Sequence, residues 1–334
     1  MDNYAFPEIA GKMAKHILEK SCAGRYDDCD TPTALGARLT EDMHEIHRDL
    51  HLIVFHSPEE ASELEKRRQE PSSDQEYSTH WWIQVHSDNF GIQKVEYLTG
   101  NIGYIDLRYF APASLGGKTA VATMNFLSRS DALIIDLLQC AGGDPFMVQL
   151  FESYLFSENE QPKLLLSMYN RPKDRTQQIW THPHVPGDRL PDIPVYVLTS
   201  RRTFSGGEDM AYTLKHHGRA IVVGETTGGG ANGVESLSIG DGFVILVPNE
   251  YPTHPITLGN WEGVGVEPDV AIPREEALQT AHIRALESLI ERSETDQRTQ
   301  VLKWYLQRVS ACYQPVKVEF VSALAVSFIF VPGL

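Results

Sequence analysis

Hydrophobic residues from position 91 onward form short apolar runs that alternate with segments of helical spacing. The apolar runs predict strands, and apolar residues that recur every three or four positions predict helices. The expected strands cover residues 91–98, 101–107, 131–138, 163–168, 193–198, 220–223 and 242–248, and the expected helices cover residues 115–127, 145–156, 208–217 and 274–306. Strands and helices that alternate in this way predict an α/β fold class.

The segment before this core has a different pattern. Apolar residues at helical spacing predict one helix over residues 6–20 and a second from the Thr31-Pro32 cap to Ile46, and residues 50–55 are expected to form a strand. Residues 57–79 are charged and have little to bury, which predicts a flexible insertion or long loop. The expected domains are a small helical domain at 1–57, a charged insertion and linker at 58–90, the α/β core at 91–312 and an atypical apolar tail at 313–334.

Composition limits the possible partners and compartments. The 334 residues are 42% hydrophobic and 22% charged, which is typical of a globular protein. A formal net charge of −16 argues against nucleic acid or an anionic membrane surface as a partner. The chain opens without the basic and apolar regions of a secretory signal and has no confident membrane span, so we expect a cytoplasmic protein or a processed secreted or periplasmic form.

The cysteines and histidines indicate no metal centre. Four cysteines make no disulfide framework, although Cys22 and Cys29 are close enough in sequence either to bridge a small loop or to remain free thiols. His44, His47 and His51 lie close together but without a His-Glu-x-x-His pattern, and no Cys/His cluster has zinc spacing. The sequence therefore predicts neither a metal nor another cofactor.

A serine between a strand and a helix is the first candidate for catalysis. Ser205 opens a Ser-Gly-Gly turn that follows the apolar run at 193–198 and precedes the helix that begins near Glu208. The unpaired amides and positive dipole end of a helix N-terminus stabilise an anion, so Ser205 is suited to be a nucleophile with the amide of Gly206 as an oxyanion donor. The alternative is that Ser205 is only a helix cap.

Two glycine-rich turns lie after other strands. The Gly142-Gly143 turn could supply a second oxyanion donor or could be a plain strand-to-helix turn. The loop Thr227-Gly-Gly-Gly230 matches no phosphate-binding pattern and is interpreted as an active-site loop or a simple connection. Asp136 lies at the apolar end of a strand and is expected to be structural, with a pKa raised by burial.

Four motifs occur in order along the chain and together resemble a known family. They are Asp136-Leu-x-x-x-x-Gly-Gly143, Ser205-Gly-Gly-Glu208, Gly218-Arg-Ala-Ile-Val-Val-Gly-Glu225 and Glu262-Gly-Val-Gly-Val-Glu-Pro-Asp269. The set resembles the tail-specific or C-terminal processing serine peptidases. The helical N-terminus joined to Asp49-Leu-His51-Leu52 is similar to the branch that contains interphotoreceptor retinoid-binding protein and its bacterial peptidase relatives. The resemblance covers residues 4–312 and implies a ClpP/crotonase-like α/β spiral core preceded by a small N-terminal helical bundle.

The resemblance also implies the residues of a site. The Ser-Lys peptidases of this family carry their lysine base at the position that Gly230 occupies here, so the tricorn-like arrangement of histidine, serine and glutamate is implied instead. It makes Ser205 the nucleophile, His51 the general base and Glu262 the supporting carboxylate.

The implied oxyanion donors are Gly206 together with Gly142 or Gly143. His47 and His56 compete with His51 if the register of that motif differs. Lys215, on the helix after the serine, is not expected to take part.

Two functions follow from the resemblance. The first is a serine-type peptidase that hydrolyses a peptide or protein substrate through an acyl-enzyme on Ser205, and the alternative is a non-catalytic module that binds a retinoid or another apolar ligand. Retention of Ser205, His51 and Glu262 favours the enzyme. Leu138 and Cys140 replace an arginine and an asparagine that brace the oxyanion loop in the family, which favours the alternative. The sequence makes no prediction about the oligomeric state.

Overall fold

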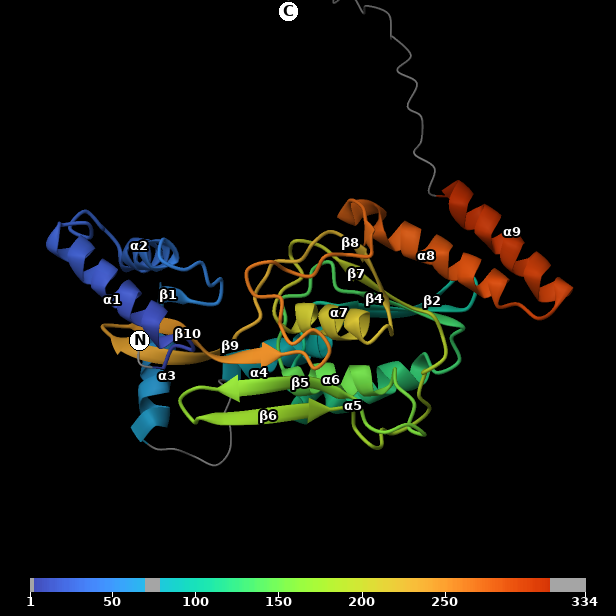
Figure 1. The fold of residues 1–334 in the computed structure, drawn as a ribbon, viewed down its shortest axis with the longest axis horizontal. Coiled ribbons are helices and arrows are strands. Elements are labelled where there is room, and N and C mark those ends of the chain that lie inside the picture. Colours follow the sequence, from blue (N-terminus) through green and yellow to red (C-terminus); the bar gives the residue numbers. More distant parts are fainter. Residues whose placement is uncertain (1–2, 70–78, 313–334) are drawn as a thin grey trace, which may run out of the picture.

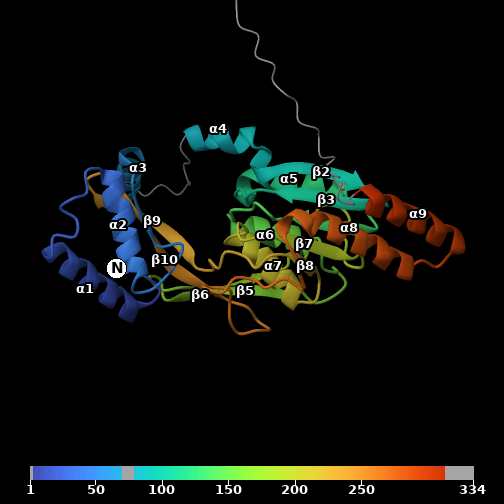
Figure 2. The ribbon, with the colours of Figure 1, turned by 90° about the horizontal axis from the view of Figure 1, so that it is seen from above.

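Two β-sheets and the helices around them make up the protein (Figures 1 and 2). The computed structural model describes residues 3–69 and 79–312. The helices are α1 (Pro7–Cys22), α2 (Pro32–His44), α3 (Pro58–Gln69), α4 (Thr79–Ser87), the short 3₁₀ helix η1 (Asn89–Gly91), α5 (Ala113–Phe126), α6 (Pro145–Ser153), α7 (Gly206–His216), α8 (Arg274–Glu291) and α9 (Asp296–Cys312). The strands are β1 (Ile53–His56), β2 (Ile92–Leu98), β3 (Ile102–Leu107), β4 (Ala132–Asp136), β5 (Leu164–Asn170), β6 (Arg175–Trp180), β7 (Val195–Thr199), β8 (Ile221–Gly224), β9 (Gly233–Gly240), β10 (Phe243–Thr253) and β11 (Val270–Ala271).

The larger sheet forms the α/β core. Its strands lie in the order β11-β8-β7-β4-β3-β2, and neighbouring strands are parallel except for the β2–β3 pair. Alternate residues of β7 face opposite sides of the sheet, so Val195 and Val197 join the hydrophobic cluster with α5, α6 and α7. Tyr196 and Leu198 join the cluster with α8 and α9 on the other face. The α/β core expected from the sequence is confirmed.

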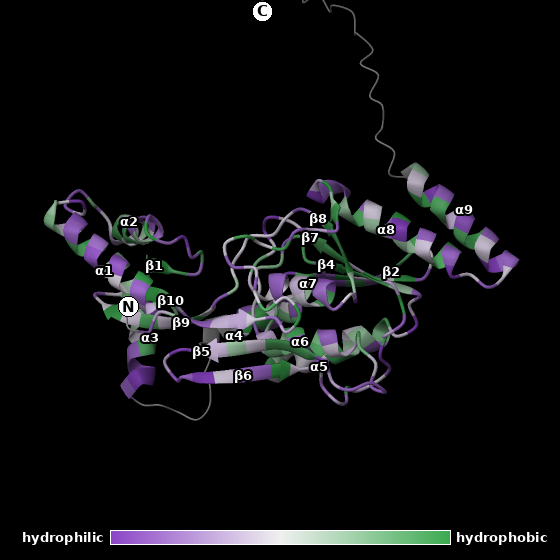
Figure 3. Ribbon diagram, viewed as in Figure 1, coloured by the Kyte–Doolittle hydropathy of each residue, from purple (hydrophilic) through white to green (hydrophobic). Residues whose placement is uncertain are grey.

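Hydropathy follows this layered arrangement (Figure 3). Every residue of β3, β4 and β7 is buried, because helices cover both faces of a sheet of this kind. The edge strand β6, which the sequence analysis missed, exposes every residue except Ile179 and therefore has no apolar run to reveal it. No helix within the described ranges combines the length and apolar character needed to cross a bilayer.

The second sheet joins the N-terminal helices to the core. Its strand order is β1-β10-β5-β6, with β9 paired to β10 as well. One end of β10 pairs with β1 and the other end pairs with β5, so a single long strand belongs to both parts of the molecule. Figure 2 shows α1, α2 and α3 at one end of the molecule, with β9 and β10 running from them toward the core.

The charged segment expected to be a loop is partly helical. The prediction of a flexible insertion at residues 57–79 was wrong for Pro58–Gln69, which forms α3. Glu59 and Glu60 lie in its first turn and Lys66, Arg67 and Arg68 in its last, so both ends complement the helix dipole. Residues 70–78 and the apolar tail at 313–334 lie outside the described residues, and the domain boundaries remain a prediction.

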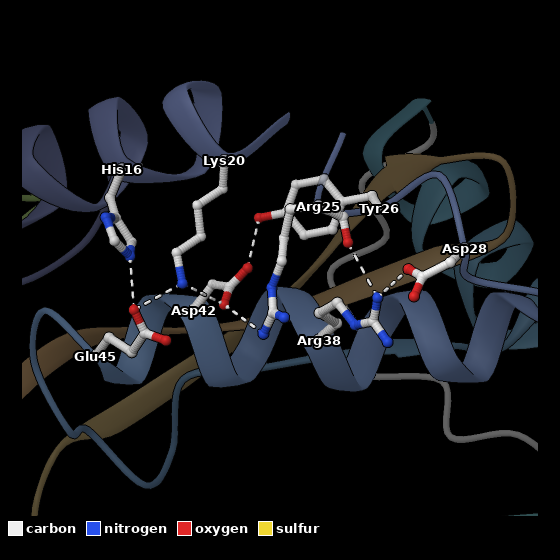
Figure 4. A network of polar contacts seen from close by, with 8 residues as sticks. All are labelled: His16, Lys20, Arg25, Tyr26, Asp28, Arg38, Asp42 and Glu45. Atoms are coloured by element: carbon white, nitrogen blue, oxygen red, sulfur yellow. Dashed lines mark hydrogen bonds and ion pairs between the residues drawn. The ribbon is translucent and has the colours of Figure 1, made fainter. Parts of the chain in front are cut away.

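A polar network holds α1 against α2 (Figure 4). The fully buried carboxylate of Asp42 accepts hydrogen bonds from Lys20 at 2.9 Å, Tyr26 at 2.9 Å and Arg25 at 3.3 Å. Lys20 also donates to Glu45 at 2.7 Å, and Arg38 pairs with Asp28. Nearby, Cys22 and Cys29 are free thiols, so of the two possibilities left open by the sequence the disulfide is not formed.

Candidate active site

Ser205 occupies a strained turn between β7 and α7. Its backbone has φ +51° and ψ −120°, a conformation that costs a residue with a side chain about 1–3 kcal/mol and is concentrated at functional sites. The backbone N–H of Ser205 donates to Oε2 of Glu208 at 2.9 Å, which fixes the turn from the first helical turn of α7. A plain helix cap needs no such strain, because caps normally adopt the extended region.

The segment before Ser205 is tied to the glycine turn after β4. Ser200 Oγ donates to the carbonyl of Leu138 at 2.6 Å, and Thr203 Oγ1 donates to the carbonyl of Leu137 at 2.7 Å. The amide of Phe204 donates to the carbonyl of Cys140 at 3.0 Å. These three bonds brace the turn through backbone carbonyls, so they do not depend on which side chains stand at positions 138 and 140.

Two backbone amides lie close together beside the serine. A Cβ built on Gly206 would lie 3.1 Å from the amide nitrogen of Gly143, so the two glycines adjoin. Neither amide donates to another group within the described ranges, whereas the amide of Gly142 is directed to the sulfur of Cys140. Gly142 instead leaves room for Ser205, because a Cβ there would come within 2.6 Å of Cβ of Ser205. Of the two candidates, Gly143 is therefore the better oxyanion donor.

His51 reaches the site from the N-terminal unit, just before β1. Its side chain is 8% exposed, and its ring lies 4.6 Å from the ring of Phe204. Burial holds the pKa of His51 below its usual range, against the opposing effect of Asp49, so the imidazole is neutral near pH 7. His51 and Ser205 line the same cavity, although no hydrogen bond joins them in the described structure. Such contacts often tighten only in the complex with substrate.

The ring of His51 also accounts for the glycine at position 230, where the Ser-Lys peptidases carry a lysine. A Cβ on Gly230 would lie 2.8 Å from Cε1 of His51 and 2.2 Å from the ring of Phe204. No side chain fits at position 230, because the histidine and its aromatic neighbour fill that space.

Glu262 lies beside His51 and shares its surroundings with a second carboxylate. Oε2 of Glu262 accepts hydrogen bonds from the amides of Ala231 at 2.7 Å and Asn232 at 3.2 Å. Oε1 of Glu262 and Nδ1 of His51 are both buried and have no hydrogen-bond partner among the described residues. Burial, with a smaller contribution from Asp49, raises the pKa of Glu262 to about 7.

Asp49 was not among the site residues expected from the sequence. Its side chain is fully buried, and it accepts hydrogen bonds from the amide of His51 at 3.1 Å, from Tyr4 at 3.1 Å and from Asn232 at 3.0 Å. It therefore fixes the backbone of His51 and adds negative charge beside the ring. In the sequence, the only indication of this contact is the position of Asp49 two residues before His51 in the Asp49-Leu-His51 motif.

Among the described residues, these three also form a group of possible metal donors. One donor atom from each of Asp49, His51 and Glu262 lies within 4.8 Å of the others. A divalent cation could be held there by two oxygens and a nitrogen. The sequence predicts no metal here. A cation at this position would occupy the same residues that are candidates for proton transfer.

Glu208 is a second residue that sequence analysis missed. Its buried carboxylate accepts hydrogen bonds from the amides of Ser205, Gly229 and Gly230 at 2.6–2.9 Å. It also accepts a hydrogen bond from the hydroxyl of Thr227. The glycine-rich loop after β8 is therefore anchored to the first turn of α7. The capping-box spacing from Ser205 to Glu208 was the available signal.

The remaining candidates lie elsewhere. Lys215 pairs with Asp269 at 3.1 Å. Asp136 accepts from Tyr104 at 2.7 Å, and burial raises its pKa, as expected for a structural carboxyl. His47 and His56 are not among the residues that line the cavity beside Ser205.

Comparisons with known proteins agree with the motifs. The model of Peptidase family S41 matches residues 101–272, and the model of the N-terminal domain of Peptidase_S41 in eukaryotic IRBP matches residues 1–84. The carboxy-terminal processing protease CtpB of Bacillus subtilis is 26% identical over 199 residues, which cover 57% of this chain and 38% of that protein. The carboxyl-terminal-processing protease of Picosynechococcus is 29% identical over 180 residues, which cover 52% of this chain and 40% of that protein.

These figures mean that the chain spans about two fifths of the length of the curated relatives it matches. The structure of the tricorn protease aligns with a TM-score of 0.51 at 16% identity and covers 87% of this chain and 35% of that one. At this identity the match concerns the fold, and it confirms the expected ClpP/crotonase-like core. Because the S41 model matches more than half of the sequence, this protein belongs to peptidase family S41.

Proposed function

We propose that the protein is a serine-type peptidase that hydrolyses peptide bonds through an acyl-enzyme on Ser205. The observation that carries the proposal is the strained serine beside two unengaged amides, in one cavity with a neutral histidine. Family membership supports the same reaction class. The substrate is a peptide or protein segment that enters this cavity.

The proposed reaction has two halves, acylation and deacylation, and His51 accepts and then returns a proton in each. Neutral His51 takes the hydroxyl proton as Oγ of Ser205 attacks the carbonyl carbon, and the oxyanion accepts hydrogen bonds from the amides of Gly206 and Gly143. The tetrahedral intermediate then expels the amine, which receives the proton from His51. Water, deprotonated by His51, attacks the ester and releases the acid and the free serine. Ionised Glu262 stabilises the imidazolium that forms in both halves.

The retinoid-binding alternative is not favoured. A module that only binds an apolar ligand has no use for a strained serine or for two free amides beside it. Nor does it account for a buried glutamate with an unpartnered oxygen next to an unpartnered histidine nitrogen.

Covalent labelling with a fluorophosphonate probe tests the proposal. We expect the probe to modify Ser205, as mapped by mass spectrometry, and the modification to be lost in Ser205→Ala and strongly slowed in His51→Ala. A chelator should leave labelling unchanged, because no step in the proposed reaction passes through a metal. The absence of labelling in a folded sample would reject the peptidase, and loss of labelling on chelation would assign Asp49, His51 and Glu262 to a metal instead.

A further inference from the structure

The cavity beside Ser205 has apolar walls. It has a volume of 440 Å³ and opens next to the nucleophile and the amides of Gly206 and Gly143. Its apolar lining residues include several from β5, β9, β10 and the segment before Glu262, namely Leu166, Met168, Val234, Pro252 and Trp261. Such walls suit the methylene stem of a long side chain.

A buried carboxylate with a free oxygen lines this apolar space. Asp209 lies on α7, four residues after Ser205, and is 7% exposed. Its Oδ1 accepts from Thr213 Oγ1 at 3.1 Å, and its other oxygen has no partner in the part of the chain that the structure describes. Asp209 and Ser205 line the same cavity, so Asp209 is within reach of a substrate side chain whose carbonyl lies at Ser205.

The charges around the cavity are unbalanced. Its lining includes Asp209 and Glu250 but no lysine or arginine, and His51 is neutral. The buried carboxyl of Glu152 on α6 interacts electrostatically with Asp209, and its Oε1 has no hydrogen-bond partner among the described residues. Burial raises the pKa of Asp209 to about 7, and the hydrogen bond from Thr213 only partly opposes this rise. A cation in the cavity would compensate the negative charge of Asp209.

We infer, on the basis of the proposed peptidase function, that this cavity binds the lysine or arginine side chain of the substrate residue on the N-terminal side of the scissile bond. Asp209 is the specificity-determining carboxylate, and Glu250 at the cavity wall adds to the negative potential. The apolar walls hold the aliphatic stem, and the cationic head pairs with the free oxygen of Asp209. The attraction between the two charges is stronger in a buried site than at an exposed one, because water screens it less.

Peptide binding to the Ser205→Ala variant tests the inference without catalysis. The probes are acetylated tetrapeptides that end in lysine, in Nε-acetyl-lysine or in norleucine after three alanines. We expect the lysine peptide to bind about tenfold more tightly, or better, than the two uncharged ones, as measured by calorimetry. Equal binding of the three peptides would overturn the inference, and this comparison needs no change to the pocket.

Substitution of the carboxylate then assigns the preference. In the double variant Ser205→Ala/Asp209→Asn, the advantage of lysine should fall at least several-fold, and in the matched control Ser205→Ala/Asp188→Asn it should persist, because Asp188 is exposed and does not line this cavity. A lysine preference that survives Asp209→Asn in a folded protein would contradict the role given to Asp209.

Cleavage of the same sequences, extended beyond the last residue, separates this inference from the proposed function. Asp209-dependent lysine binding without cleavage or probe labelling would reject the peptidase and leave the basic subsite standing. Equal cleavage after lysine and norleucine would support the peptidase and reject the subsite.

Discussion

Glu208 is the single residue on which most of the active-site turn depends. One buried carboxylate accepts hydrogen bonds from the amides of Ser205, Gly229 and Gly230, so it sets both the serine and the loop that packs under His51. Burial raises the pKa of Glu208 and the hydrogen bonds oppose that rise. Carboxylates with several charge-assisted bonds are costly to replace, since each amide would lose its partner.

Replacing Glu208 by glutamine should therefore damage both folding and reaction. The amide group would place N–H donors against backbone donors, which should lower the free energy of unfolding by about 1–3 kcal/mol. We expect labelling of Ser205 to slow as well, measured with the probe at equal folded fraction. Glu291→Gln on the exposed side of α8 is the control, and a Glu208→Gln protein with normal labelling would show that the turn keeps its geometry without this carboxylate.

The ionisation of Glu262 should appear in the pH profile. Its pKa, raised to about 7 by burial and by Asp49, leaves it neutral in mild acid, where it cannot stabilise an imidazolium. His51 has a lowered pKa and so remains an available base over the same range. We expect the labelling rate to rise as pH passes through about 7, and Glu262→Gln to be slower and to lose this rise. A profile that is the same in both proteins would remove Glu262 from the reaction.

The effect of pH on the contribution of Glu262 to stability is opposite to its expected effect on the labelling rate. The folded state binds the Glu262 proton more tightly than the unfolded chain does, since the folded pKa is the higher one. The contribution of this carboxyl to stability is thus fully present below the ordinary glutamate value and declines as pH rises from there through about 7.

At the scale of elements, α1 and α2 depend on the network around Asp42. Burial acts to raise the pKa of Asp42, but hydrogen bonds from Lys20, Tyr26 and Arg25 outweigh it, and the pKa is lowered. The stabilisation is present above the ordinary aspartate pKa and is lost as pH falls through the lower folded value. His51 lies between α2 and β1, and Met43 of α2 and Val54 of β1 belong to one hydrophobic cluster, so the helix pair also supports the segment that carries His51.

Asp42→Ala should loosen the helix pair. It removes three charge-assisted hydrogen bonds from a buried acceptor, and we expect a loss of about 1–3 kcal/mol in the free energy of unfolding, measured by denaturant titration. Asp28→Ala is the matched control, because its carboxylate is mostly exposed and pairs only at the edge of the network. If the two substitutions lower the free energy of unfolding equally, the buried hydrogen bonds of Asp42 contribute no more than the exposed pair of Asp28.

At the scale of the whole molecule, the site is assembled from both ends of the fold. His51 and Asp49 come from the N-terminal unit, whereas Ser205 and Glu262 come from the core, and β10 joins the two parts. The first described residues take part as well: Tyr4 donates to Asp49, and the amide of Ala5 donates to the carbonyl of Pro248 on β10 at 2.8 Å.

Tyr4→Phe tests whether this long-range contact matters for the base. Removing the hydroxyl leaves Asp49 with the amide of His51 and the side chain of Asn232, and we expect labelling of Ser205 to slow by about 2- to 10-fold. Tyr97→Phe is the control, since its hydroxyl bonds to a backbone carbonyl on the exposed surface. If both variants label alike, Tyr4 serves stability alone.

The sequence by itself determined the local elements and the candidate chemistry. Apolar runs located β3, β4 and β7 because strands covered on both faces must be hydrophobic throughout. The less buried strands β2, β5, β8 and β10 were located from their apolar and β-branched residues. Ordered motifs around Ser205, His51 and Glu262 indicated the family, and the glycine turns were found because positive φ there admits little else. These features depend on neighbours within a few residues, so the linear chain contains them.

Only the tertiary structure decided how these pieces act together. The choice of Gly143 over Gly142, the anchoring of the glycine loop by Glu208 and the pairing of Asp49 with Tyr4 depend on contacts between residues far apart in the chain. Polar edge strands such as β6 and β9 and the helix α3 were missed because their residues bury little, and their structure comes from pairing and end charges. A pattern of hydrophobic positions records burial, and it does not record which distant groups share a hydrogen bond.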